Sequence, residues 1–257
     1  MEISIKGGRP IDDPSYARIG YLNKITSAVT ASTDAVLIPN TFERWTTSTG
    51  TVTASFNIGN LSTVNYIAIG AHNLFSAGVT NVRVQCKTSA GSFITVATIK
   101  PQSNSPIYFE FNDFLLCAQV SVTITGGTNR EIGIIYAGQS LIMQRALFGG
   151  HNPINLSSMT EYRNSMSDSG QFLGRRIKRK GQQSSFAWAN ITDEWYRDNF
   201  QPFVNAAKTT PFFIKTRPDY YVDEVAFGYT TADISPSNQG GTTRMLSVNF
   251  TMRAHDE

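Results

Sequence analysis

The sequence predicts a mainly β protein, with an N-terminal antiparallel jelly-roll sandwich followed by an α+β assembly domain that has one main helix. Three observations support this fold class. Short segments of the first half alternate apolar and polar side chains with a period of two, and the segments between them are rich in Gly, Asn, Ser and Pro. Only one stretch, close to residue 200, places its apolar side chains at helical spacing.

The residue pattern of the sequence changes at Phe148-Gly149-Gly150, from short alternating strands before it to a basic cluster, a helix and aromatic strands after it. This change predicts a joint between two modules. We expect an N-terminal arm over residues 1–24, a β-sandwich over residues 25–142 and an assembly domain over residues 143–257. The chain of 257 residues is 40% hydrophobic, which is enough to build real cores, whereas only 16% of its residues are charged.

Alternation identifies the strands of the first module. Val82, Val84 and Cys86, for example, alternate with polar neighbours, which is typical of a strand with one buried and one wet face. The same pattern predicts strands at 51–56, 82–87 and 120–125, and further strands are expected at 66–70, 93–99, 107–111 and 132–136.

In the second module Thr192 is suited to cap a helix, and the two acidic residues that follow it favour the positive end of the helix dipole. Pro202 interrupts the apolar stripe of this helix, so we expect either a kink or two short helices that meet there. The stripe comprises Tyr196, Phe200, Phe203, Val204 and Ala207. Strands are expected at 172–180, 184–188, 211–215, 222–229 and 246–253, with the helix covering their sheet.

No catalytic residue, metal site or cofactor is expected. The sequence contains no HExxH, no GxSxG and no glycine loop before a helix, and His72, His151 and His255 are its only histidines. Cys86 and Cys117 form no CxxC pair and are expected to be buried free thiols. A glycosidase carboxylate pair stays open as an alternative, because such a pair is spatial and cannot be recognised from spacing.

Charge and hydropathy limit the classes of partner. The net charge of +3 and the pI of about 8.8 are too mild to predict nucleic acid as a partner of the whole chain. The apolar runs are far shorter than the roughly 20 residues of a membrane helix, and no signal-peptide pattern opens the sequence. We therefore expect synthesis in the cytosol without membrane insertion.

The candidate ligand-binding residues are His72 and Asn73, which follow a predicted strand, together with Trp45 as an aromatic platform. An imidazole and an amide beside an aromatic ring are suited to bind a sugar. The alternative is structural, with Asn73 turning the chain and His72 bonding to local backbone.

The only concentrated charge in the sequence consists of Arg175, Arg176, Lys178, Arg179 and Lys180. Regular alternation would place Arg175, Ile177 and Arg179 on one side of a strand and leave both of its faces charged. We expect this cluster to contact acidic residues of a neighbouring subunit; the alternatives are a solvated strand edge and phosphate contact.

Four segments carry a resemblance to a known family: "IAIGAHNL" from Ile67, "QSLIMQRALFGGHNP" from Gln139, "SDSGQFLGRRIKRKG" from Ser167 and "PFFIKTRPDYYVDEVAFGY" from Pro211. In order and pattern the chain resembles tail-tip structural proteins of long-tailed bacteriophages, and is most similar to distal tail proteins that carry a galactose-binding-like jelly roll. The family usually has its ring-forming module first, whereas here the order is reversed.

The resemblance implies a virion protein of the tail tip or baseplate, assembled in the host cytoplasm. Its implied partners are further copies of itself in a closed ring, most often of six, the tail tube protein, tail hub or fibre proteins, and a cell-surface glycan bound by the jelly roll. Two other functions remain open from the sequence, namely a carbohydrate-binding host-attachment protein and a glycan hydrolase.

Overall fold

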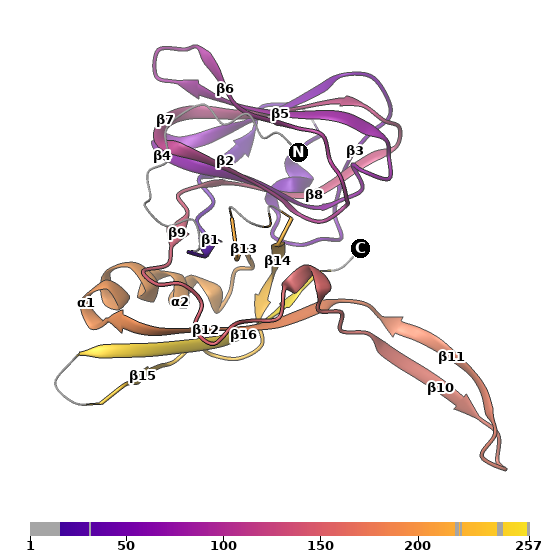
Figure 1. Ribbon diagram of the computed structural model, residues 1–257. Helices are drawn as coiled ribbons and strands as arrows, with labels where there is room; N and C mark the ends of the chain where they lie inside the picture. Colours follow the sequence, from indigo (N-terminus) through magenta and orange to yellow (C-terminus); the bar gives the residue numbers. More distant parts are fainter. Residues whose placement is uncertain (1–15, 31, 219–220, 222, 241–243, 256–257) are drawn as a thin grey trace.

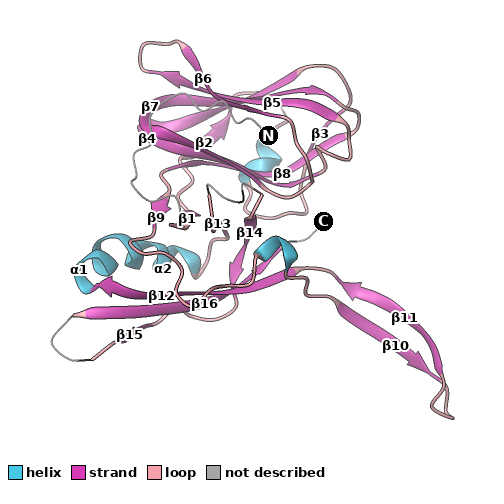
Figure 2. Ribbon diagram, viewed as in Figure 1, coloured by secondary structure: helices cyan, strands magenta, loops and turns pink. Residues whose placement is uncertain are grey.

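The computed structural model describes residues 16–255 apart from residues 31, 219–220, 222 and 241–243 (Figure 1). The predicted mainly β fold class is confirmed. The described residues form two seven-stranded sheets and one two-stranded hairpin, with every strand pair antiparallel and few helical turns between them (Figure 2). Most of the predicted N-terminal arm, residues 1–15, lies outside the described residues.

The first sheet builds the sandwich and runs in the order β3-β8-β4-β7-β5-β6, with β2 paired to β4. Its strands are β2 (Ile25–Ala28), β3 (Trp45–Thr47), β4 (Val52–His72), β5 (Val79–Thr88), β6 (Phe93–Ile99), β7 (Ile107–Gly126) and β8 (Arg130–Gly138), and a 3₁₀ turn, η1 (Asp34–Leu37), lies between β2 and β3. Each of the seven predicted segments overlaps a strand, but together they form five strands, because 51–56 and 66–70 both belong to β4, and 107–111 and 120–125 both belong to β7. Strands β2 and β3 were not predicted.

Strands β4 and β7 are much longer than the sequence indicated, because each passes through both layers of the sandwich. Residues 52–57 of β4 pair with 119–124 of β7, whereas residues 66–69 pair with 107–110 of β7 and with β8. Register shifts between these stretches bend both strands. The single sheet therefore curls over a core that includes Phe56, Ile67, Val84, Phe109 and Val122.

The second sheet runs in the order β12-β16-β14-β13-β1-β9, with β15 paired to β16. Its strands are β1 (Arg18–Gly20), β9 (Leu141–Ile142), β12 (Gln182–Thr192), β13 (Phe212–Lys215), β14 (Val225–Thr230), β15 (Pro236–Asn238) and β16 (Met245–Ala254). Strand β1 pairs with β13, and β9 pairs with β1. The boundaries predicted at residues 24 and 142 therefore need correction, because both β1 and β9 belong to the second sheet.

The predicted helix consists of α1 (Asp193–Trp195), a π-helical turn η3 (Tyr196–Phe200) and α2 (Gln201–Ala207). Thr192 caps it as expected, since its hydroxyl accepts a hydrogen bond from the Trp195 N–H at 3.4 Å. The three parts are contiguous, and Pro202 lies just after the π-helical turn, so the helix is irregular before the proline but does not divide into two. Phe203 packs edge-on against Phe212 of the sheet at 4.9 Å, so the helix covers the sheet as predicted.

A cluster of buried aromatic residues joins the two modules. Tyr66, Tyr108 and Tyr136 of the sandwich pack against Phe213 and Phe227 of the second sheet. The Tyr66 hydroxyl donates to the Leu22 carbonyl at 2.8 Å, and the Tyr136 hydroxyl donates to the Pro211 carbonyl at 3.2 Å. The phenol groups thus bury their rings while they satisfy backbone groups of the neighbouring module.

The hairpin of β10 (Glu161–Met166) and β11 (Phe172–Arg179) extends away from this body (Figure 1). It follows the 3₁₀ turn η2 (Ile154–Leu156) and pairs with neither of the larger sheets. The strand predicted at 172–180 is therefore present, but it lies outside the sheet that the helix covers.

Candidate functional site

Trp45, His72 and Asn73 lie close to one end of the sandwich, but their side chains are not available to a ligand. Trp45 on β3 is only 5% exposed and His72 at the end of β4 is fully buried. Burial lowers the pKa of His72 from 6.5 to about 4, against the opposing effect of backbone hydrogen bonds, so the ring is neutral at physiological pH. His72 Nδ1 accepts a hydrogen bond from the Leu74 N–H at 3.4 Å.

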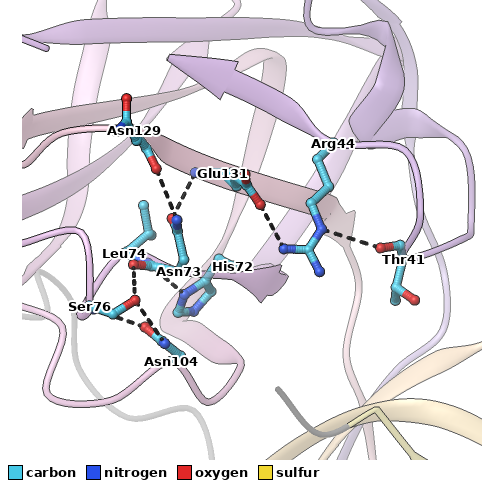
Figure 3. A network of polar contacts seen from close by, with 9 residues as sticks. All are labelled: Thr41, Arg44, His72, Asn73, Leu74, Ser76, Asn104, Asn129 and Glu131. Carbon is cyan, nitrogen blue, oxygen red and sulfur yellow. Dashed lines mark hydrogen bonds and ion pairs between the residues drawn. The ribbon is translucent and has the colours of Figure 1, made fainter. Parts of the chain in front are cut away.

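The Asn73 side chain joins two loops (Figure 3). Its Nδ2 donates to the Asn129 carbonyl at 2.9 Å, and its Oδ1 accepts from the Glu131 N–H at 2.7 Å. Both ends of the amide are therefore used within the protein. The sugar-binding prediction for Trp45, His72 and Asn73 is corrected accordingly, because the first two are buried and the third bonds to backbone.

Neighbouring side chains extend this network (Figure 3). Asn104 Oδ1 accepts from the N–H groups of Phe75 and Ser76, both at 3.1 Å, and Arg44 donates to the Glu131 carboxylate at 2.9 Å. The network holds the loops at this end of the sandwich in one arrangement. These loops also expose two large apolar side chains, Phe42 at 92% and Phe75 at 52%. The exposure of Phe42 was not predicted, although the sequence shows a single aromatic residue within a polar turn there.

The basic cluster lies on the projecting hairpin, and its two faces differ. Cross-strand partners share a face in an antiparallel pair. One face carries the pairs Tyr162–Ile177, Asn164–Arg175 and Met166–Phe172, and the other carries Glu161–Arg179, Arg163–Arg176 and Ser165–Gly174. The first face is largely apolar and the second largely basic.

This arrangement corrects the expectation that both faces are charged. A register shift between Glu161 and Tyr162 leaves Lys178 as the extra residue of a bulge, so Arg179 lies on the face opposite to Ile177. Arg175 is the one basic residue of the apolar face, and its guanidinium stacks on the Tyr162 ring at 4.0 Å. Lys180 follows the end of β11 and is exposed.

Charge on the basic face is only partly neutralised within the hairpin. Lys178 and Arg179 approach the Glu161 carboxylate at 2.5 Å and 3.7 Å, and the hydrogen bond from Lys178 is the main reason that the pKa of Glu161 is lowered. Residues 161–180 hold six basic and two acidic side chains. Their net charge of +4 exceeds the +3 of the chain, so the other residues together carry −1.

Meanwhile the apolar face lacks any cover among the described residues. Met166, Phe172, Leu173 and Ile177 are each more than half exposed, and Tyr162 is 46% exposed. A two-stranded ribbon is marginally stable in water on its own, and its outer strand edges leave backbone groups unpaired. The hairpin thus has exposed apolar side chains and unpaired strand edges, which are typical of a surface that another molecule covers.

The joint at Gly149 and Gly150 leads directly into a buried polar cluster. Both glycines have positive φ, at 68° and 82°, which favours glycine over other residues. His151 then places Nε2 at 3.8 Å from a carboxylate oxygen of Glu224. Glu224 also accepts hydrogen bonds from Thr216 and from Arg217 Nε, both at 2.8 Å.

Burial and hydrogen bonds set the protonation of this cluster. Burial raises the pKa of Glu224, but the hydrogen bonds from Arg217 and Thr216 outweigh it and the pKa is lowered overall. Burial likewise lowers the pKa of His151. The carboxylate is thus bonded to Thr216 and Arg217, and the imidazole of the joint lies beside it.

Among the described residues no group of three His, Cys, Asp or Glu side chains is arranged to hold a metal ion. Cys86 and Cys117 are buried free thiols, as predicted. A hydrogen bond with Cys117, together with burial, raises the pKa of Cys86, which favours the protonated thiol. In the described part of the chain, no helix has the length and apolar character that crossing a membrane requires.

No family model and no curated protein matches the sequence. Solved structures with similar folds include allantoicase (18% identity, TM-score 0.36, 51% of this chain and 45% of that one). The N-terminal domain of the single-strand break repair protein XRCC1 is 11% identical, with a TM-score of 0.35 over 49% of this chain and 100% of that one. A truncated AlyQ with CBM32 and alginate lyase domains is 14% identical, with a TM-score of 0.36 over 68% of this chain and 49% of that one. The chain thus spans less than half the length of allantoicase and of the AlyQ chain. With TM-scores this low, function has to be inferred from the chain itself.

Proposed function

We propose that this chain is a non-enzymatic structural subunit that assembles with further copies of itself through the β10–β11 hairpin. The observation that carries the proposal is the amphipathic hairpin, which projects from the body with an uncovered apolar face and a basic face. Burial of that face stabilises both the hairpin and the contact, because apolar surface leaves water.

A second copy is the partner that fits the distribution of charge. Residues 161–180 carry +4 and the rest of the chain carries −1 in total, so overall charge does not oppose a contact between the hairpin of one subunit and the body of the next. A contact between a hairpin and a different surface is heterologous, and such contacts close into rings when the rotation allows. We expect a closed ring of six subunits.

The resemblance of four sequence segments to tail-tip proteins of long-tailed phages supports a place in the virion. In that setting the ring joins the tail tube protein to tail hub or fibre proteins. Mass spectrometry of purified phage particles tests this part of the proposal, which fails if the chain is absent from them.

Self-assembly is tested by the mass of the full chain in solution, measured by light scattering after gel filtration. We expect a single oligomer for the wild type and a folded monomer for Phe172→Ser combined with Ile177→Ser. Leu156→Ser is the matched control, because Leu156 is 77% exposed but lies outside the hairpin. A wild type that stays monomeric at every concentration, or a double variant that still assembles, would refute the proposal.

A further inference from the structure

A groove of about 480 Å³ opens where the end of the helix, the end of β14 and a loop of the sandwich meet. It is lined by Pro39 of the sandwich, by residues 207–211 at the end of the helix and by residues 229–233 at the end of β14. None of these residues belongs to the hairpin or to the sandwich network described above. The volume is in the range of pockets that bind small ligands.

The groove presents an aromatic ring beside free polar groups. Tyr229 is 53% exposed, although the four residues of β14 that precede it are buried. None of the hydrogen bonds or ion pairs between described residues that involve side chains uses Lys208, Tyr229 or Asp233. Thr210 and Thr230 add hydroxyl groups to the same lining.

The backbone that carries these side chains is held in place on each side. Tyr229 pairs with Arg253 of β16, and the Thr231 N–H donates to the Thr251 carbonyl at 3.0 Å. Pro211 accepts the hydrogen bond from Tyr136 of the sandwich at 3.2 Å. The groove is therefore largely preformed, so a ligand would lose little binding energy in ordering it.

We propose that this groove binds a neutral oligosaccharide, with one sugar ring stacked on Tyr229. Sugar rings have an apolar face that suits an aromatic ring, and their hydroxyls both donate and accept hydrogen bonds. Lys208 supplies donors only and Asp233 supplies acceptors only, and their opposite charges cancel. The lining thus matches a polar, uncharged ligand better than a nucleotide, an anion or an apolar molecule.

The test is binding of the full-length protein to a printed panel of neutral oligosaccharides built from glucose, galactose, mannose, rhamnose and N-acetylglucosamine. Titration of the best-bound glycan then gives dissociation constants for the wild type and its variants. Tyr229→Ala should bind at least about tenfold more weakly, because it loses the stacked ring. Tyr229→Phe, which keeps the ring, should stay within about threefold of the wild type, and Asp233→Asn should lie between the two variants.

Phe75→Ala is the matched control. Phe75 is 52% exposed, nearly as much as Tyr229, but it lies on the loops at the end of the sandwich. This control should bind the glycan like the wild type. The proposal is overturned if the wild type binds no glycan of the panel, if Tyr229→Ala binds as tightly as the wild type, or if Phe75→Ala is the variant that loses binding.

Discussion

Arg18 of the second sheet donates through Nε to the Glu110 carboxylate of the sandwich at 2.6 Å, and both side chains are largely buried. The two residues are 92 positions apart in the sequence and belong to different modules. Their contact shows that the segment before the sandwich is part of the junction between the modules. The protein is therefore held together by its N-terminal segment as well as by the joint at Gly149 and Gly150.

Replacing Arg18 with Met should lower the free energy of unfolding by about 3 kcal/mol, because Glu110 is left as an unpaired carboxylate in a largely buried site. Urea unfolding followed by tryptophan fluorescence measures the loss. The double variant with Glu110→Leu is the control and should recover most of the stability. Equal stability of Arg18→Met and the wild type would show that the ion pair does not support the junction.

Asn73→Ala should destabilise the sandwich without weakening oligosaccharide binding. The variant loses two hydrogen bonds to backbone, each contributing about 1 kcal/mol, so we expect a loss of about 2 kcal/mol. Thermal unfolding and glycan titration of the same sample separate the two effects. A variant of wild-type stability that no longer binds glycan would restore Asn73 as a ligand-binding residue.

His72 should make the protein less stable as the pH falls from 6.5 to 4. Its pKa is lowered to about 4 in the folded protein, so within this window the unfolded state binds a proton that the folded state does not. The shift corresponds to about 3 kcal/mol at the acid end of the window. His72→Leu should flatten the stability profile between these pH values, and NMR should find the ring neutral at pH 5.

Glu224 should contribute stability that is lost at lower pH. Its pKa in the folded protein lies below the ordinary value of 4.5, so its contribution is present above pH 4.5 and disappears as the pH falls through the lowered pKa. The melting temperature of Glu224→Gln should be lower than that of the wild type at pH 7, and the two should converge in acid. A difference that stays constant down to pH 3 would contradict this assignment.

Local patterns were sufficient to predict most of the elements. Strand patterns located five of the seven strands of the sandwich, and the cap at Thr192 and the apolar stripe after it located the helix. These predictions succeeded because a strand or a helix with one buried face imposes its own period on the sequence. The same local signal could not show that β4 and β7 each continue through two layers.

The candidate sites depended on contacts that local patterns do not contain. His72 and Asn73 looked like ligand-binding residues because both are polar and follow a strand, yet the fold buries one and bonds the other to backbone. Two register shifts, which leave Lys178 and Leu173 as extra residues, decided that the hairpin has an apolar face. Tyr229 was not predicted to line a groove, because its neighbours there come from segments around residues 39 and 208.

The sequence by itself determined the mainly β fold class, the position of the one helix and the basic character of residues 175–180, since each is a property of neighbouring residues. Only the tertiary structure decided that β1 and β9 join the second sheet, that the basic strand projects as an amphipathic hairpin, and which side chains stay exposed. The physical reason is that strand partners and burial are set by contacts between residues far apart in the chain. No periodicity within a segment records those contacts.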